Sequence, residues 1–144
     1  MEPQELLFII LGLITLNFAL EQVLDYLNLK KQSIRLPREL KDIYDEVAYA
    51  KSIAYQKAQT RFSFITSTIS FIVFFVLVLS GAFGFLDTLV RDSFSNEIMI
   101  SLVFFGVLYI ASDLLSLPFQ LYNTFVIEEK FGFNKTTPKT FIAD

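Results

Sequence analysis

The amino-acid sequence predicts an all-α integral membrane protein, a helical bundle of three transmembrane helices with an amphipathic helical loop on the cytoplasmic side. Three observations lead to this fold class. Of the 144 residues, 53% are hydrophobic and only 19% are charged, whereas a soluble domain carries roughly a quarter charged residues. Three stretches are long and apolar enough for membrane-crossing helices, which need about 20 residues each. The basic residues gather in one connecting segment, which gives the three spans a consistent orientation.

The first span is expected over residues 4–27. Its charge-free core is too short to cross a bilayer alone, so the span includes Glu21 and Asp25 near its end. A cleaved signal peptide is the alternative. The segment before the core carries Glu2 and Glu5 but no basic residue, and no small-x-small cleavage site follows the core. A retained membrane anchor is therefore the better interpretation.

Residues 28–61 are expected to form a cytoplasmic loop that contains helix. Pro37 suits the first turn of a helix, and apolar residues recur after it at helical spacing. The loop can hold one helix or two with a break near Asp45, and its last part can run directly into the second span. The favoured interpretation is an amphipathic helix that rests on the headgroups or on its own bundle. A docking face for a soluble domain is the alternative.

The second span is expected over residues 62–86, which carry no charge and meet the required length alone. Ser63 and Ser67 lie four residues apart on one helical face, and small hydroxyl residues at that spacing favour close packing of a neighbouring helix. The lining of an aqueous cavity is the alternative. Gly81 and Gly84 are expected to loosen or terminate the helix near its outer end.

The third span is expected over residues 98–127, where Asp113 is the only ionisable residue. Such a residue usually faces the bundle or a water-filled cavity, and its partners here must be hydroxyls, water or residues outside this chain. Pro118 removes one backbone donor and is expected to kink or break the helix. Gly132 is expected to end it.

Thr137 and Pro138 together signal the start of a further helix, since a hydroxyl cap precedes a proline in the first turn. The sequence given ends at Asp144, soon after this signal. We therefore expect the chain to be a piece of a longer protein.

The distribution of Lys and Arg orients the spans. Basic residues of short loops stay on the cytoplasmic side, so the N-terminus is expected outside or in a lumen, and the C-terminus in the cytoplasm. The first loop is strongly basic, the second loop holds only Arg91, and the tail after the third span is basic again. The basic residues of the first loop and the tail are Lys30, Lys31, Arg35, Arg38, Lys41, Lys51, Lys57, Arg61, Lys130, Lys135 and Lys139.

The chain has no cysteine and no histidine. Disulfides, thiolate nucleophiles and Cys/His zinc sites are therefore excluded within it, and so is the common general base near neutral pH. We expect no cofactor in this chain and no catalytic activity from it alone.

The strongest local signal is the run Leu-Pro-Phe-Gln-Leu-Tyr-Asn-Thr-Phe-Val-Ile-Glu-Glu-Lys-Phe-Gly-Phe-Asn at 117–134. Two earlier parts of the chain accompany it: Leu-Pro-Arg-Glu-Leu at 36–40, and Lys51 and Ser52 with Tyr55. Together these residues resemble the N-terminal membrane region of the CAAX prenyl protease 1 family, the integral-membrane HExxH zinc metallopeptidases.

This resemblance implies a bundle of membrane helices around a large water-filled chamber with a zinc site facing into it. Eukaryotic members remove the last three residues of prenylated CaaX proteins, and bacterial members look like general membrane endopeptidases. HExxH supplies two zinc-binding histidines and a glutamate base, so none of these roles can be carried over to this chain. Glu128 and Glu129 do not replace that site, because adjacent helical residues diverge by about 100°. Zinc is expected in a catalytic portion that this chain lacks.

We therefore interpret residues 1–144 as the N-terminal transmembrane portion of a CAAX prenyl protease 1-like metalloendopeptidase, which forms part of the chamber wall and packs on the catalytic portion. The alternative is a free-standing small membrane protein that binds or regulates a partner. Expected partners are the lipid bilayer, the catalytic portion and, for the full-length family, a peptide or prenylated CaaX substrate, with no nucleic acid. The membrane is a bacterial inner membrane or an endoplasmic reticulum. Residues with an expected structural or interdomain role are Pro118, Tyr122, Asn123, Phe125, Glu128, Glu129, Gly132, Phe133 and Asn134.

Overall fold

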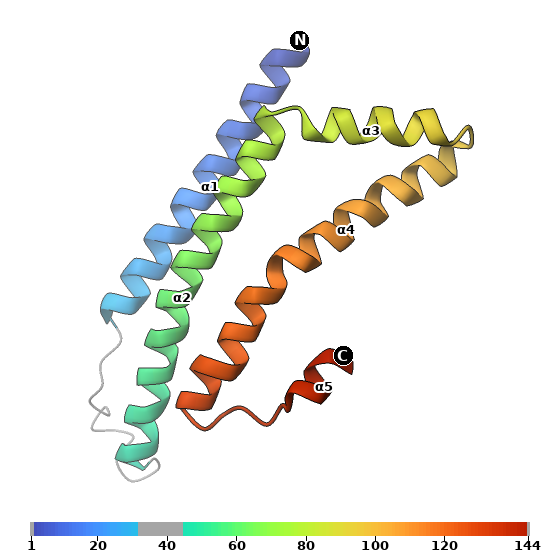
Figure 1. Ribbon diagram of the computed structural model, residues 1–144. Coiled ribbons are helices and arrows are strands. Elements are labelled where there is room, and N and C mark those ends of the chain that lie inside the picture. The colour runs from blue at the N-terminus through green and yellow to red at the C-terminus, as the bar shows by residue number, and fades with distance from the viewer. Residues whose placement is uncertain (1, 32–44, 144) are drawn as a thin grey trace. The chain divides into compact units, whose positions relative to one another are not determined.

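The computed structural model of the chain describes residues 2–31 and 45–143, and within these ranges every regular element is a helix (Figure 1). The expected helix start at Pro37 lies outside the described residues. Three helices are long and apolar enough to cross a membrane: Gln4–Lys31, Glu46–Leu79 and Glu97–Glu128. These helices confirm the all-α fold class with three membrane spans.

Few side chains of these helices are buried within the chain itself. Among the described residues, the buried apolar side chains are Leu11, Ile53, Val90, Ile100 and Ile127. Most of the other large apolar residues of the spans are exposed, so their surfaces require lipid or further protein to cover them.

The chain divides into two compact units, which we describe separately. The first unit comprises residues 1–68 and 123–144, and the second comprises residues 69–122.

In the first unit, helix α1 (Pro3–Lys31) is joined to helix α2 (Glu46–Leu79) by a side-chain hydrogen bond. Gln22 Nε2 donates to Ser67 Oγ at 2.8 Å. The serines of the second span were expected to contact a neighbouring helix, and Ser67 does so through this bond.

Helix α2 begins directly after Asp45, where a break in the loop was one of the expected alternatives. The Asp45 carboxylate accepts the backbone N–H of Val47 at 3.0 Å, as an N-cap side chain does. From there α2 continues without interruption to Leu79. The last part of the loop therefore runs directly into the second span.

In the second unit, the second span ends earlier than expected. The helix stops at Leu79, and Gly81 follows with φ 73°, a left-handed conformation that favours glycine. Helix α3 (Ala82–Ser93) then begins, and Gly84 lies within it. Gly81 thus ends the helix of the second span, as was expected of the two glycines here, and residues 82–86 of the expected range 62–86 belong to the next helix.

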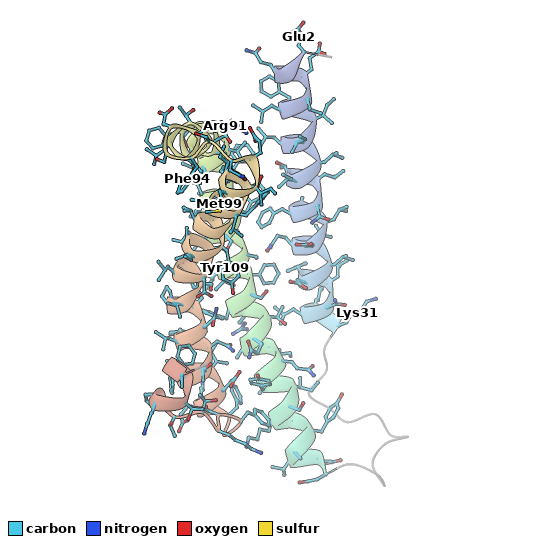
Figure 2. The ribbon with its side chains drawn as sticks, turned by 90° about the vertical axis from the view of Figure 1, so that its right-hand side faces the viewer. Glu2, Lys31, Arg91, Phe94, Met99 and Tyr109 are labelled. Atoms are coloured by element: carbon cyan, nitrogen blue, oxygen red, sulfur yellow. The ribbon has the colours of Figure 1, made fainter. Side chains whose placement is uncertain are left out.

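Helices α3 and α4 (Glu97–Tyr122) form a hairpin, closed by a short turn. The carboxamide oxygen of Asn96 caps α4 by accepting the backbone N–H of Ile98 at 2.9 Å. Arg91 donates Nε to Asp87 at 3.0 Å and Nη1 to Glu97 at 3.2 Å. The hydrogen bond that Arg91 donates to Asp87, reinforced by the one it donates to Glu97, raises the pKa of Arg91 above its ordinary value. Figure 2 views α3 nearly along its axis, with Arg91 labelled.

Helix α4 passes through Pro118 without a break, so an interruption at this proline is excluded. Within a membrane span, neighbouring groups can satisfy the backbone carbonyl that a proline leaves without its donor. The helical geometry changes only after Tyr122, where a π-helical segment, η2 (Asn123–Glu128), begins.

Candidate interface at the end of the third span

The π-helix η2 brings the side chains of its first and last residues together. Asn123 Nδ2 donates to the Glu128 carboxylate at 3.1 Å, although the two residues are five positions apart. The other carboxamide atom of this residue, Asn123 Oδ1, is buried and accepts no hydrogen bond from the described residues. π-Helical turns occur frequently at functional sites, and a buried acceptor without a donor is costly.

The helix that contains η2 ends in a Schellman motif at Gly132. This glycine has φ 67°, and its N–H donates to the Glu129 carbonyl at 2.9 Å. The next N–H, that of Phe133, donates to the Glu128 carbonyl at 2.9 Å. These two bonds satisfy carbonyls that would otherwise lack donors at a helix end. Gly132 therefore ends the helix, as the sequence predicted.

The carboxamide of Asn134 makes two hydrogen bonds just after the helix end. Asn134 Nδ2 donates to the Glu129 carboxylate at 2.9 Å, while Asn134 Oδ1 accepts the backbone N–H of Thr136 at 2.7 Å. Glu128 and Glu129 thus each receive one amide donor from within the segment. Whether they also contact another part of a longer protein stays a prediction.

The segment after Gly132 packs against α2. The Tyr55 ring lies 4.8 Å from the Phe133 ring and 5.6 Å from the Phe131 ring, measured between centroids. Lys51, one turn earlier on α2, places its ammonium 5.3 Å from the Phe133 centroid. Such ring pairs and cation–π contacts stabilise beyond the burial of their area.

The chain then returns toward η2 through helix α5 (Pro138–Ala143). Thr137 caps it, since its Oγ1 accepts the backbone N–H of Thr140 at 3.2 Å. The Phe141 ring contacts the Phe125 ring at 5.6 Å in an edge-to-face arrangement. The expected helix start at Thr137 and Pro138 is confirmed.

Polar side chains form a stripe along α4, which we call the α4 polar stripe. Its members are spaced four, three and four residues apart, so they share one face of the helix. Gln120 Nε2 donates to Ser116 Oγ at 2.7 Å, and Ser116 Oγ donates to the Asp113 carbonyl at 2.8 Å. No described residue donates to the Asp113 carboxylate. The stripe consists of Tyr109 (labelled in Figure 2), Asp113, Ser116 and Gln120.

The structure thus joins two motifs that the sequence presented separately, the Lys51 and Tyr55 pair and the run at 117–134. The α4 polar stripe beyond Asp113 was missed, although the helical spacing of Tyr109, Ser116 and Gln120 was available as a signal. Of the other expected residues, Pro118 and Tyr122 lie near the end of α4 with Tyr122 half exposed.

The described residues include no group of three or more His, Cys, Asp or Glu side chains that could hold a metal ion. The interface therefore offers ring contacts, amide hydrogen bonds and one buried acceptor rather than a metal centre.

Comparisons with known proteins show which family the chain resembles. A family model described as the CAAX prenyl protease N-terminal region, with five membrane helices, matches residues 25–144. The CAAX prenyl protease 1 homolog of Mus musculus is 38% identical over 121 residues, which cover 79% of this chain and 26% of that protein. CAAX prenyl protease 1 of Saccharomyces cerevisiae is 34% identical over 147 residues, which cover 94% of this chain and 32% of that protein.

A solved structure has the same fold. The crystal structure of S. mikatae Ste24p matches 100% of this chain and 35% of its own chain, with a TM-score of 0.81 and 31% sequence identity. The chain spans about a quarter to a third of the length of the relatives that it matches. Its described residues hold three candidate spans, against the five membrane helices of the family description.

Proposed function

Because this chain belongs to the family of CAAX prenyl protease N-terminal regions, we propose that it forms part of the wall of a water-filled membrane chamber and packs on the catalytic portion of such a protease. It is a multi-pass integral membrane chain. The catalytic portion would hold the zinc, which activates a water molecule for attack on a peptide bond.

The α4 polar stripe is the observation that carries the proposal. Tyr109, Asp113 and Gln120 are exposed on a helix long and apolar enough to cross a membrane. An ionisable side chain in the hydrocarbon region is expensive unless it meets water or protein. A chamber filled with water gives the Asp113 carboxylate solvent while the other faces of α4 remain in contact with lipid or helices.

Asn123 and the segment after Gly132 support the second part of the proposal, that this chain packs on the catalytic portion. The buried Asn123 Oδ1 needs a donor that the described residues do not provide, and Phe133 is still 46% exposed although it contacts Tyr55. A backbone N–H or a basic side chain of the catalytic portion would satisfy the carboxamide. An aromatic or aliphatic side chain would cover the exposed part of Phe133.

The full-length protein is proposed to act on peptide or prenylated CaaX substrates, as the names of its relatives indicate. We place the N-terminus outside or in a lumen and the C-terminus in the cytoplasm. The basic residues at the end of α1, in the following loop and in the tail favour the cytoplasmic side. An endoplasmic reticulum and a bacterial inner membrane both satisfy this orientation.

Complementation tests the function directly. The chain would be co-expressed with the part of S. mikatae Ste24p that lies outside the matched region, and release of a C-terminal tripeptide from a prenylated peptide would be measured. We expect neither part to cleave alone and the pair to cleave with zinc. If the two parts assemble but the chain contributes nothing to cleavage, the free-standing regulator becomes the better interpretation.

Cysteine accessibility tests the chamber wall without depending on turnover, since the native chain has no cysteine. Asp113→Cys and Gln120→Cys are expected to react with a small charged methanethiosulfonate reagent in the assembled pair. Leu114→Cys, on another face of α4, is the matched control and is expected to stay unreactive. Equal reactivity at positions 113 and 114 would contradict the assignment of the stripe to an aqueous wall.

Orientation is tested with two further single cysteines. Ser95→Cys, between α3 and α4, is expected to be labelled from outside intact cells or sealed vesicles by an impermeant maleimide. Lys31→Cys, at the end of α1, is expected to be labelled only after permeabilisation. The reverse pattern would overturn the proposed orientation.

A further inference from the structure

Helix α3 lies between two membrane spans and is tied closely to both. Only Ser80 and Gly81 separate it from the end of α2, and the turn 94–96 separates it from α4. The Phe83 ring contacts the Phe74 ring of α2 at 6.0 Å, and Arg91 bridges to Glu97 at the start of α4. Figure 1 shows α3 running across the direction of α4 rather than continuing it.

The apolar surface of α3 is wider than the part that packs on its neighbours. Val90 is 4% exposed in the α3–α4 hairpin. Phe85 and Leu89, four residues apart and therefore on one face, are 71% and 54% exposed. Asp87 and Arg91 lie on the opposite, polar side of the helix, and Thr88 and Asp92 border that side next to Phe85. A continuous apolar arc thus begins at the packed side and extends onto Phe85 and Leu89.

We propose that α3 lies in the plane of the membrane surface, with Phe85 and Leu89 inserted at the boundary between the headgroups and the acyl chains of one leaflet. The occupant of this exposed apolar face is lipid. The proposal rests on the membrane insertion of α2 and α4 and does not require the chamber, the catalytic portion or the proposed orientation.

Covalent continuity with the two spans argues for lipid as the occupant. The short connections keep α3 within a few residues of the points where α2 and α4 leave the hydrocarbon region. A helix with separate apolar and polar faces at that depth lies in the interface. Its polar side carries groups that tolerate headgroups and water, including the ion pair of Asp87 and Arg91.

The charges of α3 indicate whether it binds lipid through anionic headgroups or through apolar contact. Interfacial helices that bind anionic lipid are rich in Lys and Arg, but Arg91 is the only basic residue of α3 and its turn. Asp87, Asp92 and Glu97 outnumber it. Attraction to anionic headgroups is therefore weak here, and insertion of Phe85 and Leu89 depends on apolar contact.

Spin labels can measure the depth of α3 because the chain contains no cysteine. Phe85→Cys and Asp87→Cys, on opposite sides of α3, would each carry a nitroxide, with the chain in phosphatidylcholine nanodiscs. Collision with molecular oxygen reports lipid, and collision with nickel-EDDA reports water. We expect the oxygen-to-nickel collision ratio to be several-fold higher at position 85 than at position 87. Leu89→Cys provides a second reporter on the same face if the change at Phe85 disturbs folding.

The same labels distinguish lipid from protein as the occupant. In the pair assembled with a cysteine-free version of the Ste24p part, the label at position 85 should remain accessible to oxygen. Loss of both oxygen and nickel collisions at position 85 upon assembly would mean that protein covers this face and would overturn the proposal. Equal collision ratios at positions 85 and 87 in the chain alone would overturn it as well.

Discussion

Two regions of the molecule each contain a left-handed glycine that ends a long helix, but they differ in what surrounds it. Gly132, with φ 67°, precedes a segment that packs its aromatic rings on Tyr55 and Lys51 of α2. Gly81, with φ 73°, lies in open space, and a β-carbon there would meet nothing within 4 Å. The packing around Gly132 depends on particular side chains, whereas the region after Gly81 depends on the alternation of apolar and polar residues along α3.

This difference shows where substitutions matter. Near Gly132, ring contacts, amide hydrogen bonds and a π-helix all involve specific residues, so single changes remove several interactions at once. In the α3–α4 hairpin, the ion pairs of Arg91 are exposed, and exposed pairs contribute little.

The largest expected effect comes from Tyr55→Ala. Truncation of a fully buried aromatic residue costs about 3–5 kcal/mol, and Tyr55 is only partly buried, so we expect a loss of about 2 kcal/mol in the free energy of unfolding. Thermal unfolding of the purified chain in detergent measures it. Tyr109→Ala, at a side chain that is 74% exposed, is the control.

A conservative change at the same position separates ring packing from hydrogen bonding. Tyr55→Phe keeps the contacts with Phe131 and Phe133 but loses the hydroxyl that accepts Gln59 Nε2 at 2.7 Å. We expect at most about 1 kcal/mol of destabilisation. Similar losses for Tyr55→Phe and Tyr55→Ala would show that the rings contribute little.

The two left-handed glycines sharpen the comparison further. Gly132→Ala and Gly81→Ala should each cost about 1–2 kcal/mol, because a β-carbon is unfavourable at positive φ. A β-carbon at Gly132 would also lie 3.5 Å from Lys51 Nζ, an ordinary contact, so the two losses should be nearly equal. Gly106→Ala, within α4 and with nothing nearby, should be neutral or slightly stabilising. A much larger loss at Gly132 would mean that Lys51 cannot move aside.

A smaller effect is expected when Glu128→Gln and Glu129→Gln are combined. Glutamine still accepts the hydrogen bonds from Asn123 and Asn134, so the chain alone should lose less than about 1 kcal/mol. In the assembled pair, a further fall in melting temperature would indicate that a basic group of the catalytic portion contacts these carboxylates. An unchanged melting temperature of the pair would favour solvated carboxylates. Loss of turnover with unchanged folding and zinc content would instead indicate a direct role with substrate.

The smallest effect is expected from Arg91→Ala. Its ion pairs with Asp87 and Glu97 are exposed, so the melting temperature should fall far less than for Tyr55→Ala, and high salt should remove even this difference. Because the pKa of Arg91 is raised, deprotonation of Arg91 removes its contribution only as the pH rises through that elevated value. A large, salt-independent fall would show that the α3–α4 hairpin depends on this residue.

Much of this fold follows from local sequence signals. A break near Asp45, the helix start at Thr137 and Pro138, and the helix end at Gly132 are each read from neighbouring residues. The expected range of the second span extended to Leu86 because the apolar run continues that far, although Gly81 was expected to loosen or end the helix. Hydropathy carries no information on backbone conformation, and it is the positive φ of Gly81 that separates α2 from the amphipathic helix α3.

The candidate interface could be predicted only in part. Lys51 and Tyr55 were recognised through a family resemblance, and nothing in their local sequence indicates that Phe131 and Phe133 would meet them. Such contacts are made between segments distant in the chain, where local propensity carries no information. The passage of α4 through Pro118 likewise depends on surroundings that satisfy the backbone.

The π-helix has one consequence for how the chain tolerates changes in length. In an α-helix, residues five apart are separated by roughly 500°, so their side chains would diverge by about 140°. Asn123 and Glu128 meet because η2 contains one residue more than an α-helix would use for the same rotation. Deletion of one residue here, such as the half-exposed Val126, would restore α-helical winding and leave the angular phase of residues 129–134 unchanged. The segment that docks on Tyr55 would keep its direction, and only the pairing of Asn123 with Glu128 would disappear.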